Sequence, residues 1–234
     1  MEAGGTGNPF ADKYVRIGFI RKVYLILTVQ MLITTGIIGA FMFTPGAKEF
    51  YLKHVYVFMG LSILGIVLVF VMSCFDSLRR SFPINFIILF AFVRPSIAST
   101  PEPLRYERIE IFIAVGITAV SFLVLRGLTR NGLSFQIDFT VYSGLAFVFC
   151  IVLCVAGLIL LFVKIKILHL LYACGGTLLF SFYIVIDTQL IVGGDKRTFA
   201  LSPEDYIAGA LTLYLDVINV FLFILQILSV LREE

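Results

Sequence analysis

The sequence is poor in charged residues. Asp, Glu, Lys and Arg make up 14% of its 234 residues, against about 25% in an average soluble protein. This low charge, together with 60% hydrophobic residues and a mean hydropathy of +1.03, excludes a disordered chain, which needs high charge and low hydrophobicity. It also excludes an ordinary soluble domain, which could not remove so much apolar surface from water. The class that remains is a polytopic helical membrane protein.

Motifs for nucleotide, nucleic-acid and metal binding are missing. The sequence has no glycine-rich phosphate loop, no dinucleotide fingerprint and no block of basic residues, and its net charge is only +3. The cysteines Cys74, Cys150, Cys154 and Cys174 lie in or beside apolar runs, and none forms a metal-type C-x-x-C. We interpret them as small hydrophobic residues in packed helices. Neither a cofactor nor a nucleic-acid partner is expected.

Long apolar runs predict an all-α membrane bundle of about seven transmembrane helices. A helical crossing takes about 20 apolar residues, and continuous rather than alternating runs argue against a β-barrel. We expect a polar N-terminal tail at 1–22, a single bundle domain at 23–231 and a short C-terminal tail at 232–234. The expected spans are 23–43, 55–75, a disrupted third span from Pro83, then 109–125, 139–163, 167–193 and 206–231.

Two aspartates lie inside expected spans, where a carboxylate costs about 2.5–3.5 kcal/mol on insertion scales. Asp187 belongs to the sixth span and Asp216 to the seventh, and the short connection makes these spans antiparallel neighbours. At about 1.5 Å per residue, Asp187 lies roughly 10 Å before Gly194 and Asp216 roughly 16 Å after Asp205. We therefore expect the two carboxyl groups within reach of each other. Such a pair would share a proton and titrate as a unit, which suits a pH-dependent latch, and its oxygens could bind Ca²⁺.

Further polar residues accompany the aspartates. Tyr183 lies one turn before the first aspartate and Thr188 directly follows it, while Thr212 and Asn219 flank the second at helical spacing. We interpret these four as supporting polar residues of the site. The alternative is that Ser and Thr on these helices only form hydrogen bonds between helices.

Basic residues suggest an orientation and a partner for the aspartates. Arg79 and Arg80 end the second span and could reach inward to an aspartate, although membrane topology alone also explains them. Basic residues before the first span predict a cytosolic N-terminus. They are Lys13, Arg16, Arg21 and Lys22.

A set of motifs is together highly specific. They are Pro9-Phe10 with residues 15–24, residues 83–86, Ile186-Asp187-Thr188-Gln189 with Gly193-Gly194, residues 201–206, and residues 213–219. With these motifs the sequence resembles the Bax inhibitor (transmembrane Bax inhibitor motif) family, in its lifeguard branch. The resemblance implies seven membrane helices around a central seventh, a pH-dependent Ca²⁺ leak from intracellular stores, and protection from apoptosis.

The resemblance also assigns residues and surroundings. It implies that Asp187 and Asp216 form the pH-sensing latch, with Arg79, or less directly Arg80, as its basic partner. It implies a multi-pass protein of the endoplasmic reticulum or Golgi, with the plasma membrane or endolysosome as alternatives. The expected partners are the lipid bilayer, Ca²⁺ as the permeant ion, and membrane or apoptosis-regulating proteins.

The sequence departs from the family pattern in the third and fourth spans. After the apolar residues 84–93, Arg94-Pro95 interrupts the third span, and a second irregular patch covers 125–133. We hypothesise that residues 93–134 carry a local frameshift or a misplaced exon boundary. If the segment is genuine, the third span is broken, which favours a protein that does not conduct.

Three functions are compatible with the sequence. The leading one is a pH-sensitive Ca²⁺ leak channel of intracellular membranes that inhibits apoptosis. The alternative is a non-conducting membrane regulator of apoptosis that acts by binding other proteins. A remote alternative is an intramembrane aspartyl protease, but such enzymes carry glycines before the second aspartate, where this chain has Leu213-Tyr214-Leu215. We therefore do not expect an enzyme.

Overall fold

The computed structural model of the chain describes residues 13–46, 49–50, 53–54, 56–57, 60, 64, 67, 108–131, 138–160, 162–163, 165–192 and 204–232. These residues form helices joined by turns, and no strand occurs among them, which confirms the all-α class. The third expected span and both arginines proposed as latch partners, Arg79 and Arg80, lie outside the described residues.

The described helices follow the apolar runs of the sequence. Their bounds are α1 Lys13–Phe43, α7 Arg108–Asn131, the 3₁₀ helix η1 Phe139–Tyr142, α9 Ser143–Leu160, α10 Lys166–Val192 and α11 Tyr206–Arg232. Helix α1 begins before Val23, where the apolar run starts. The backbone of α7 stays helical to Asn131 and so continues into the irregular patch at 125–133.

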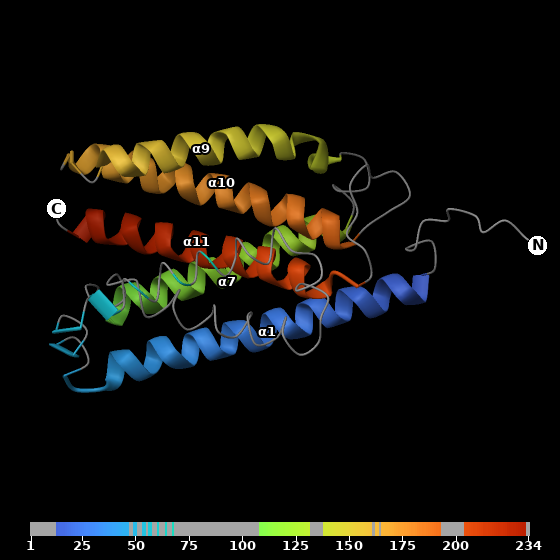
Figure 1. Cartoon of the computed structure of the whole chain (residues 1–234), viewed down its shortest axis with the longest axis horizontal. Helices are drawn as coiled ribbons and strands as arrows, with labels where there is room; N and C mark the ends of the chain where they lie inside the picture. Colours follow the sequence, from blue (N-terminus) through green and yellow to red (C-terminus); the bar gives the residue numbers. More distant parts are fainter. Residues whose placement is uncertain are drawn as a thin grey trace, which may run out of the picture.

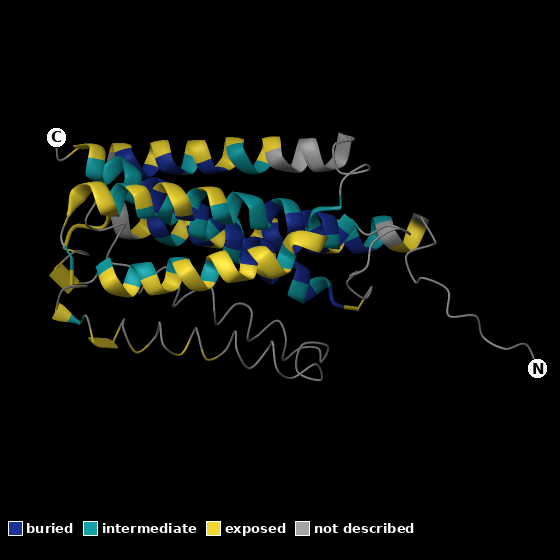
Figure 2. Cartoon of the chain, turned by 90° about the horizontal axis from the view of Figure 1, so that it is seen from above, coloured by how far each residue is buried: buried dark blue, intermediate teal, exposed yellow. Residues whose placement is uncertain are grey.

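The helices lie side by side along one long axis, with α11 near the middle (Figure 1). Helix α11 packs against α10 on one side and against α1 and α7 on others, while α9 covers the outer face of α10. Half of the most apolar segment of α11 is buried, compared with 6% of that of α9. Figure 2 shows the buried residues gathered in the middle of the bundle and the exposed ones on its outer surfaces. Helix α11 is therefore the core element.

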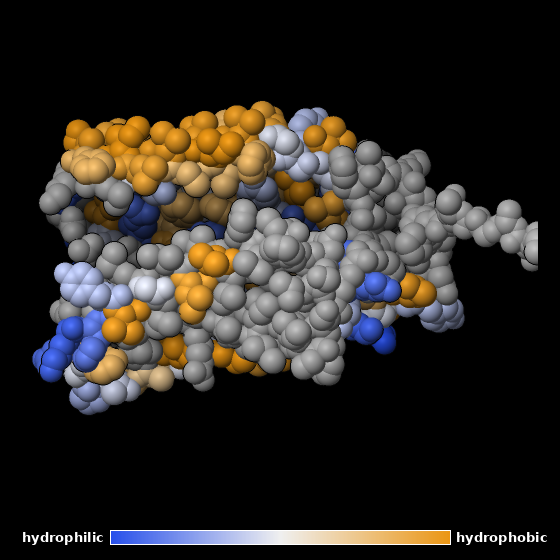
Figure 3. Space-filling view, in the orientation of Figure 1, coloured by the Kyte–Doolittle hydropathy of each residue, from blue (hydrophilic) through white to orange (hydrophobic). Residues whose placement is uncertain are grey.

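Helices α1, α9, α10 and α11 are long and apolar enough to cross a membrane by length and composition. In α7 the apolar segment is the shorter stretch Ile109–Val124. Large hydrophobic side chains remain exposed along these helices, and Figure 3 shows them covering the side of the molecule formed by α9. An outer surface this apolar is stable only against lipid. The protein is a multi-pass membrane protein.

An ion pair joins the ends of two helices. Arg232 in the last turn of α11 lies 3.2 Å from Glu110 in the first turn of α7. An acidic group at a helix N-terminus and a basic group at a C-terminus both complement the helix dipoles. The pair therefore fixes α7 antiparallel to α11 at the end of the bundle where the chain ends (Figure 1).

Candidate functional site: the aspartate pair between α10 and α11

The candidate site lies on the seam between α10 and α11. Gly176 and Asp187 share one face of α10, and Phe223 and Asp216 share one face of α11, because spacings of eleven and seven residues are close to whole numbers of helical turns. At one point of the seam the Phe223 ring lies so close to Gly176 that a Cβ there would stand 2.5 Å from it. A side chain at position 176 would therefore displace the Phe223 ring, so glycine allows this ring to pack directly against α10.

Further along the same seam the two aspartates meet. The carboxyl groups of Asp187 and Asp216 lie within hydrogen-bonding reach of each other, and the side chain of Thr212 reaches Asp187 as well. Asp216 is 6% exposed, whereas Asp187 is half-buried. One oxygen of Asp216, Oδ2, is buried without a hydrogen-bond partner. The pair therefore keeps an oxygen available for a proton or a cation.

Tyr183 connects the pair to α9. Its side chain lies within hydrogen-bonding reach of the Cys150 thiol, which in turn reaches Cys154. Both aspartates are near enough to act electrostatically on the tyrosine. Cys150 was predicted only as a small hydrophobic residue, so its contact with the polar site was missed. Its place one turn before Cys154 was the available sequence signal.

The other predicted supporting residues behave differently from one another. Asn219 donates its side-chain amide to the carbonyl oxygen of Leu215 in its own helix, at 2.8 Å. Thr188 is buried and its hydroxyl has no partner. For Thr and Ser on these helices the alternative was a hydrogen bond between helices. Thr177 donates its hydroxyl to the carbonyl oxygen of Ala173 in its own helix, at 2.9 Å. The hydroxyl proton of Thr177 is therefore used within its own helix.

A further hydrogen bond between helices lies on the opposite side of α11. The hydroxyls of Tyr214 and Thr34 of α1 are 2.9 Å apart, and both residues are buried. Thr34 also donates to the carbonyl oxygen of Gln30 at 2.8 Å. This contact was not predicted from the sequence. The spacing of Gln30 and Thr34 on one face of an apolar helix was the available signal.

A side chain beside the pair positions the start of α9. Gln189, two residues after Asp187 and fully buried, accepts a hydrogen bond from the backbone N–H of Phe139 at 2.9 Å. Asp138 caps η1 by accepting from the N–H of Thr140 at 3.0 Å and from its hydroxyl. The polar turn before α9 is therefore attached to α10 near the aspartates.

The described residues do not form a closed metal site. No group of three or more His, Cys, Asp or Glu side chains that could hold a metal ion occurs among them, whereas Ca²⁺ takes about six to eight oxygen ligands. Asp187 and Asp216, which we predicted as Ca²⁺ ligands, supply carboxylate oxygens only. Such a partial ligand set suits brief contact with a passing, partly hydrated cation better than tight storage.

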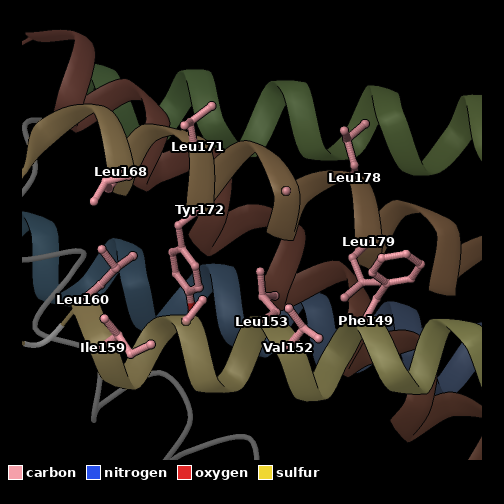
Figure 4. A pocket seen from close by; sticks show the side chains of 12 residues that line it. Phe149, Val152, Leu153, Ile159, Leu160, Leu168, Leu171, Tyr172, Leu178 and Leu179 are labelled. Carbon is pink, nitrogen blue, oxygen red and sulfur yellow. The ribbon is translucent and has the colours of Figure 1, made fainter.

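A crevice of about 590 Å³ lies between α9 and α10, on the outer side of the bundle. Tyr172 extends into it from α10 toward α9 (Figure 4), and a Cβ at Gly157 would stand 2.7 Å from the Tyr172 hydroxyl. The other side chains of its described lining are leucines, an isoleucine, a valine, an alanine and a phenylalanine. This crevice lies apart from the carboxyl chemistry and suits the acyl chains of lipid.

Comparison with known proteins identifies relatives over almost the whole chain. The model of the family described as "Bax1-I: Inhibitor of apoptosis-promoting Bax1" matches residues 16–233. Protein lifeguard 3 from Homo sapiens is 39% identical over 224 residues, which covers 93% of this chain and 70% of that protein. Protein lifeguard 4 from Mus musculus is 31% identical over 225 residues, covering 96% of this chain and 90% of that protein.

Proposed function

Because this chain belongs to the Bax inhibitor family, in its lifeguard branch, we propose that it inhibits apoptosis as a pH-sensitive Ca²⁺ leak channel of intracellular membranes. The family description names an inhibitor of an apoptosis-promoting protein. The proposal goes beyond that description in assigning ion conduction and its control to Asp187 and Asp216.

One observation carries the proposal: two carboxyl groups meet between membrane helices, and an oxygen of one of them has no partner. Intramembrane acids are expensive and are kept where they serve an ion or proton pathway. A purely structural contact would use groups that satisfy each other, as Tyr214 and Thr34 do. The pair is therefore best understood as a working site.

The pair responds to pH because its two groups titrate together. With one shared proton, the carboxyl groups attract each other across the α10–α11 seam. When that proton leaves, two negative charges face each other away from water, where their repulsion is strong. The seam then loses its hydrogen bond, and the exposed carboxylates attract a cation. The helices on either side are the elements that this change can move.

A protease is less compatible with the backbone. Helix α11 continues without interruption from Tyr206 to Arg232, so the peptide groups around Asp216 are occupied by helical hydrogen bonds. An aspartyl protease must hold an extended substrate segment beside its aspartates. A regular helix without glycine directly before Asp216 leaves no opening there for that segment.

The proposal is tested by measuring Ca²⁺ flux from proteoliposomes between about pH 6 and pH 8. We expect the intact chain to leak at a rate that changes with pH. Asp187→Asn and Asp216→Asn each leave a single carboxyl group without a charged neighbour, so the rate should become nearly independent of pH over this range.

Asp138→Asn is the matched control. Asp138 is also a carboxylate, but it caps η1, and asparagine caps helices equally well. This variant should keep the pH dependence of the intact chain. A folded, monodisperse wild-type protein that passes no Ca²⁺ at any pH, yet still protects cells from apoptosis, would contradict the channel and favour a non-conducting regulator.

A further inference from the structure

A cavity of about 450 Å³ lies among α1, α7 and α11, on a different side of α11 from the aspartate pair. Helices α1 and α7 each pack against α11, and the space between them forms the cavity. Its volume falls within the range of about 300–1,000 Å³ that is usual for small-molecule sites. The cavity can therefore hold one ligand of moderate size.

Most of the cavity wall is apolar, and no charged side chain occurs in its described lining. Helix α1 contributes Leu27 and Met31, α7 contributes Val115, and α11 contributes Val217 and Phe221. An ion or a zwitterionic head group would lose its hydration here without compensation. The ligand must be neutral over most of its surface.

Four threonines also line the cavity, but their hydroxyls are not equivalent. Three of them already donate to a backbone carbonyl oxygen one helical turn earlier, at 2.7 to 2.8 Å: Thr28, Thr34 and Thr35. The fourth, Thr118 of α7, is 4% exposed and its hydroxyl has no hydrogen-bond partner. Buried hydroxyls nearly always have a partner. Thr118 is thus the one lining threonine that still lacks one.

The hydroxyl of Thr118 can turn toward a ligand. Threonine in a helix occupies two χ1 rotamers, because its hydroxyl can form a hydrogen bond with a backbone carbonyl oxygen one turn earlier. Rotation about the Cα–Cβ bond moves the hydroxyl from one staggered position to another without moving the backbone. The hydroxyl of a ligand in the cavity could then form a hydrogen bond with the Thr118 hydroxyl.

Two apolar side chains of the described cavity lining are exposed on the outer surface. Leu32 on α1 and Leu123 on α7 both line it, and they are 68% and 60% exposed. Their exposed surfaces are apolar, so what they contact is lipid rather than water. Among the described residues, the rim between α1 and α7 is therefore apolar, which suits a molecule dissolved in the bilayer.

We propose that this cavity binds a neutral membrane amphiphile, an apolar body carrying one hydroxyl group, with Thr118 as its hydrogen-bonding partner. Sterols and diacylglycerols both have this chemistry. The site is separate from the aspartate pair, and the proposal does not depend on whether the protein conducts ions.

Binding is tested with the purified full chain in phosphatidylcholine nanodiscs, using tritiated cholesterol as the probe. We expect saturable binding that unlabelled cholesterol or dioleoylglycerol displaces, whereas 5-cholestene, which lacks the hydroxyl, displaces it weakly. Displacement by cholesterol alone identifies a rigid sterol as the ligand. Displacement by dioleoylglycerol as well identifies a site for either amphiphile.

The variants separate the hydroxyl from the cavity shape. Thr118→Val should weaken binding about five- to tenfold, the effect of one lost hydrogen bond, and Thr118→Ser should restore it. Thr35→Val is the matched control, because it removes a lining hydroxyl that is already bonded within α1, and it should leave affinity unchanged. Ala119→Phe, which fills the cavity, should abolish binding while Thr118 keeps its hydroxyl.

Thr118→Val removes a buried hydroxyl that has no partner, so the variant should be at least as stable as the intact chain. A melting temperature that does not fall shows that weaker binding does not come from misfolding. The proposal is overturned if binding is not saturable, if 5-cholestene competes as well as cholesterol, or if Thr118→Val and Thr35→Val bind alike.

Discussion

Two faces of α11 carry polar groups, and they differ in how those groups are satisfied. Toward α1, the fully buried Tyr214 pairs its hydroxyl with that of Thr34. Toward α10, Asp216 meets Asp187 and still keeps one oxygen without a partner. On the first face these two hydroxyls satisfy each other and join the helices, although the Gln30 side-chain amide, one turn before Thr34, is buried without a partner. The second face has hydrogen-bonding capacity left, at considerable cost in a membrane, which is the expected property of a site that binds or releases something.

The largest effect on stability should come from removing the packing on the face of α11 that lies toward α1. Tyr214→Ala deletes a side chain with no exposed surface and leaves a cavity against α1. We expect a loss of about 3–5 kcal/mol in the free energy of unfolding, as for other large-to-small changes in cores. Unfolding in mixed micelles measures it. Tyr56→Ala, at a tyrosine that is 84% exposed, is the control and should change stability by less than about 0.5 kcal/mol.

An intermediate effect should come from the glycines on the aspartate face. A Cβ at Gly176 would stand 2.5 Å from the Phe223 ring, whereas at Gly175 it would meet nothing within 4 Å. Gly176→Ala should therefore destabilise the protein by about 1–3 kcal/mol through overpacking. Gly175→Ala should stabilise it by about 0.5–1 kcal/mol through helix propensity. Equal shifts in melting temperature for the two variants would show that the seam is not tightly packed.

The smallest effect should be the coupling energy between the hydroxyls of Thr34 and Tyr214, on the face of α11 toward α1. A double-mutant cycle of Thr34→Val and Tyr214→Phe removes each hydroxyl with little change in shape. Hydrogen bonds between membrane helices couple by about 0.6 kcal/mol on average, and we expect a value of that order. A coupling energy of zero, with each single change also neutral, would mean that this face is held by apolar packing alone.

Much of the fold follows from the apolar pattern. The expected span 167–193 begins and ends one residue after α10 does, and the expected span 206–231 ends one residue before α11 does. The agreement is close because polar residues end both apolar runs sharply. The start of α1 was missed because hydropathy detects the part of a helix in lipid, and α1 extends beyond that part to Lys13. Both outcomes have the same cause: the pattern reports contact with lipid rather than the backbone hydrogen bonds that define a helix.

The candidate site could be predicted only as far as neighbouring helices determine it. The short connection and the positions of Asp187 and Asp216 within their spans were enough to bring the two together. Thr34 and Tyr214 are 180 positions apart in sequence, and either side chain could have faced its own backbone, as Thr28 and Thr35 do. Which hydroxyl forms a hydrogen bond with another helix depends on how helices distant in the sequence rotate and pack against each other. The periodicity of a single helix contains no information about that packing.

The central claim is that the aspartate face controls conduction and the tyrosine face holds the bundle. It is tested most directly by measuring Ca²⁺ flux at about pH 6 and pH 8, together with melting temperature, for Asp216→Asn and Tyr214→Phe. We predict that Asp216→Asn removes the difference in flux between the two pH values without lowering the melting temperature. Tyr214→Phe should lower the melting temperature and keep that difference. If Asp216→Asn retains the wild-type pH difference, or Tyr214→Phe abolishes it, the division of roles between the two faces is contradicted.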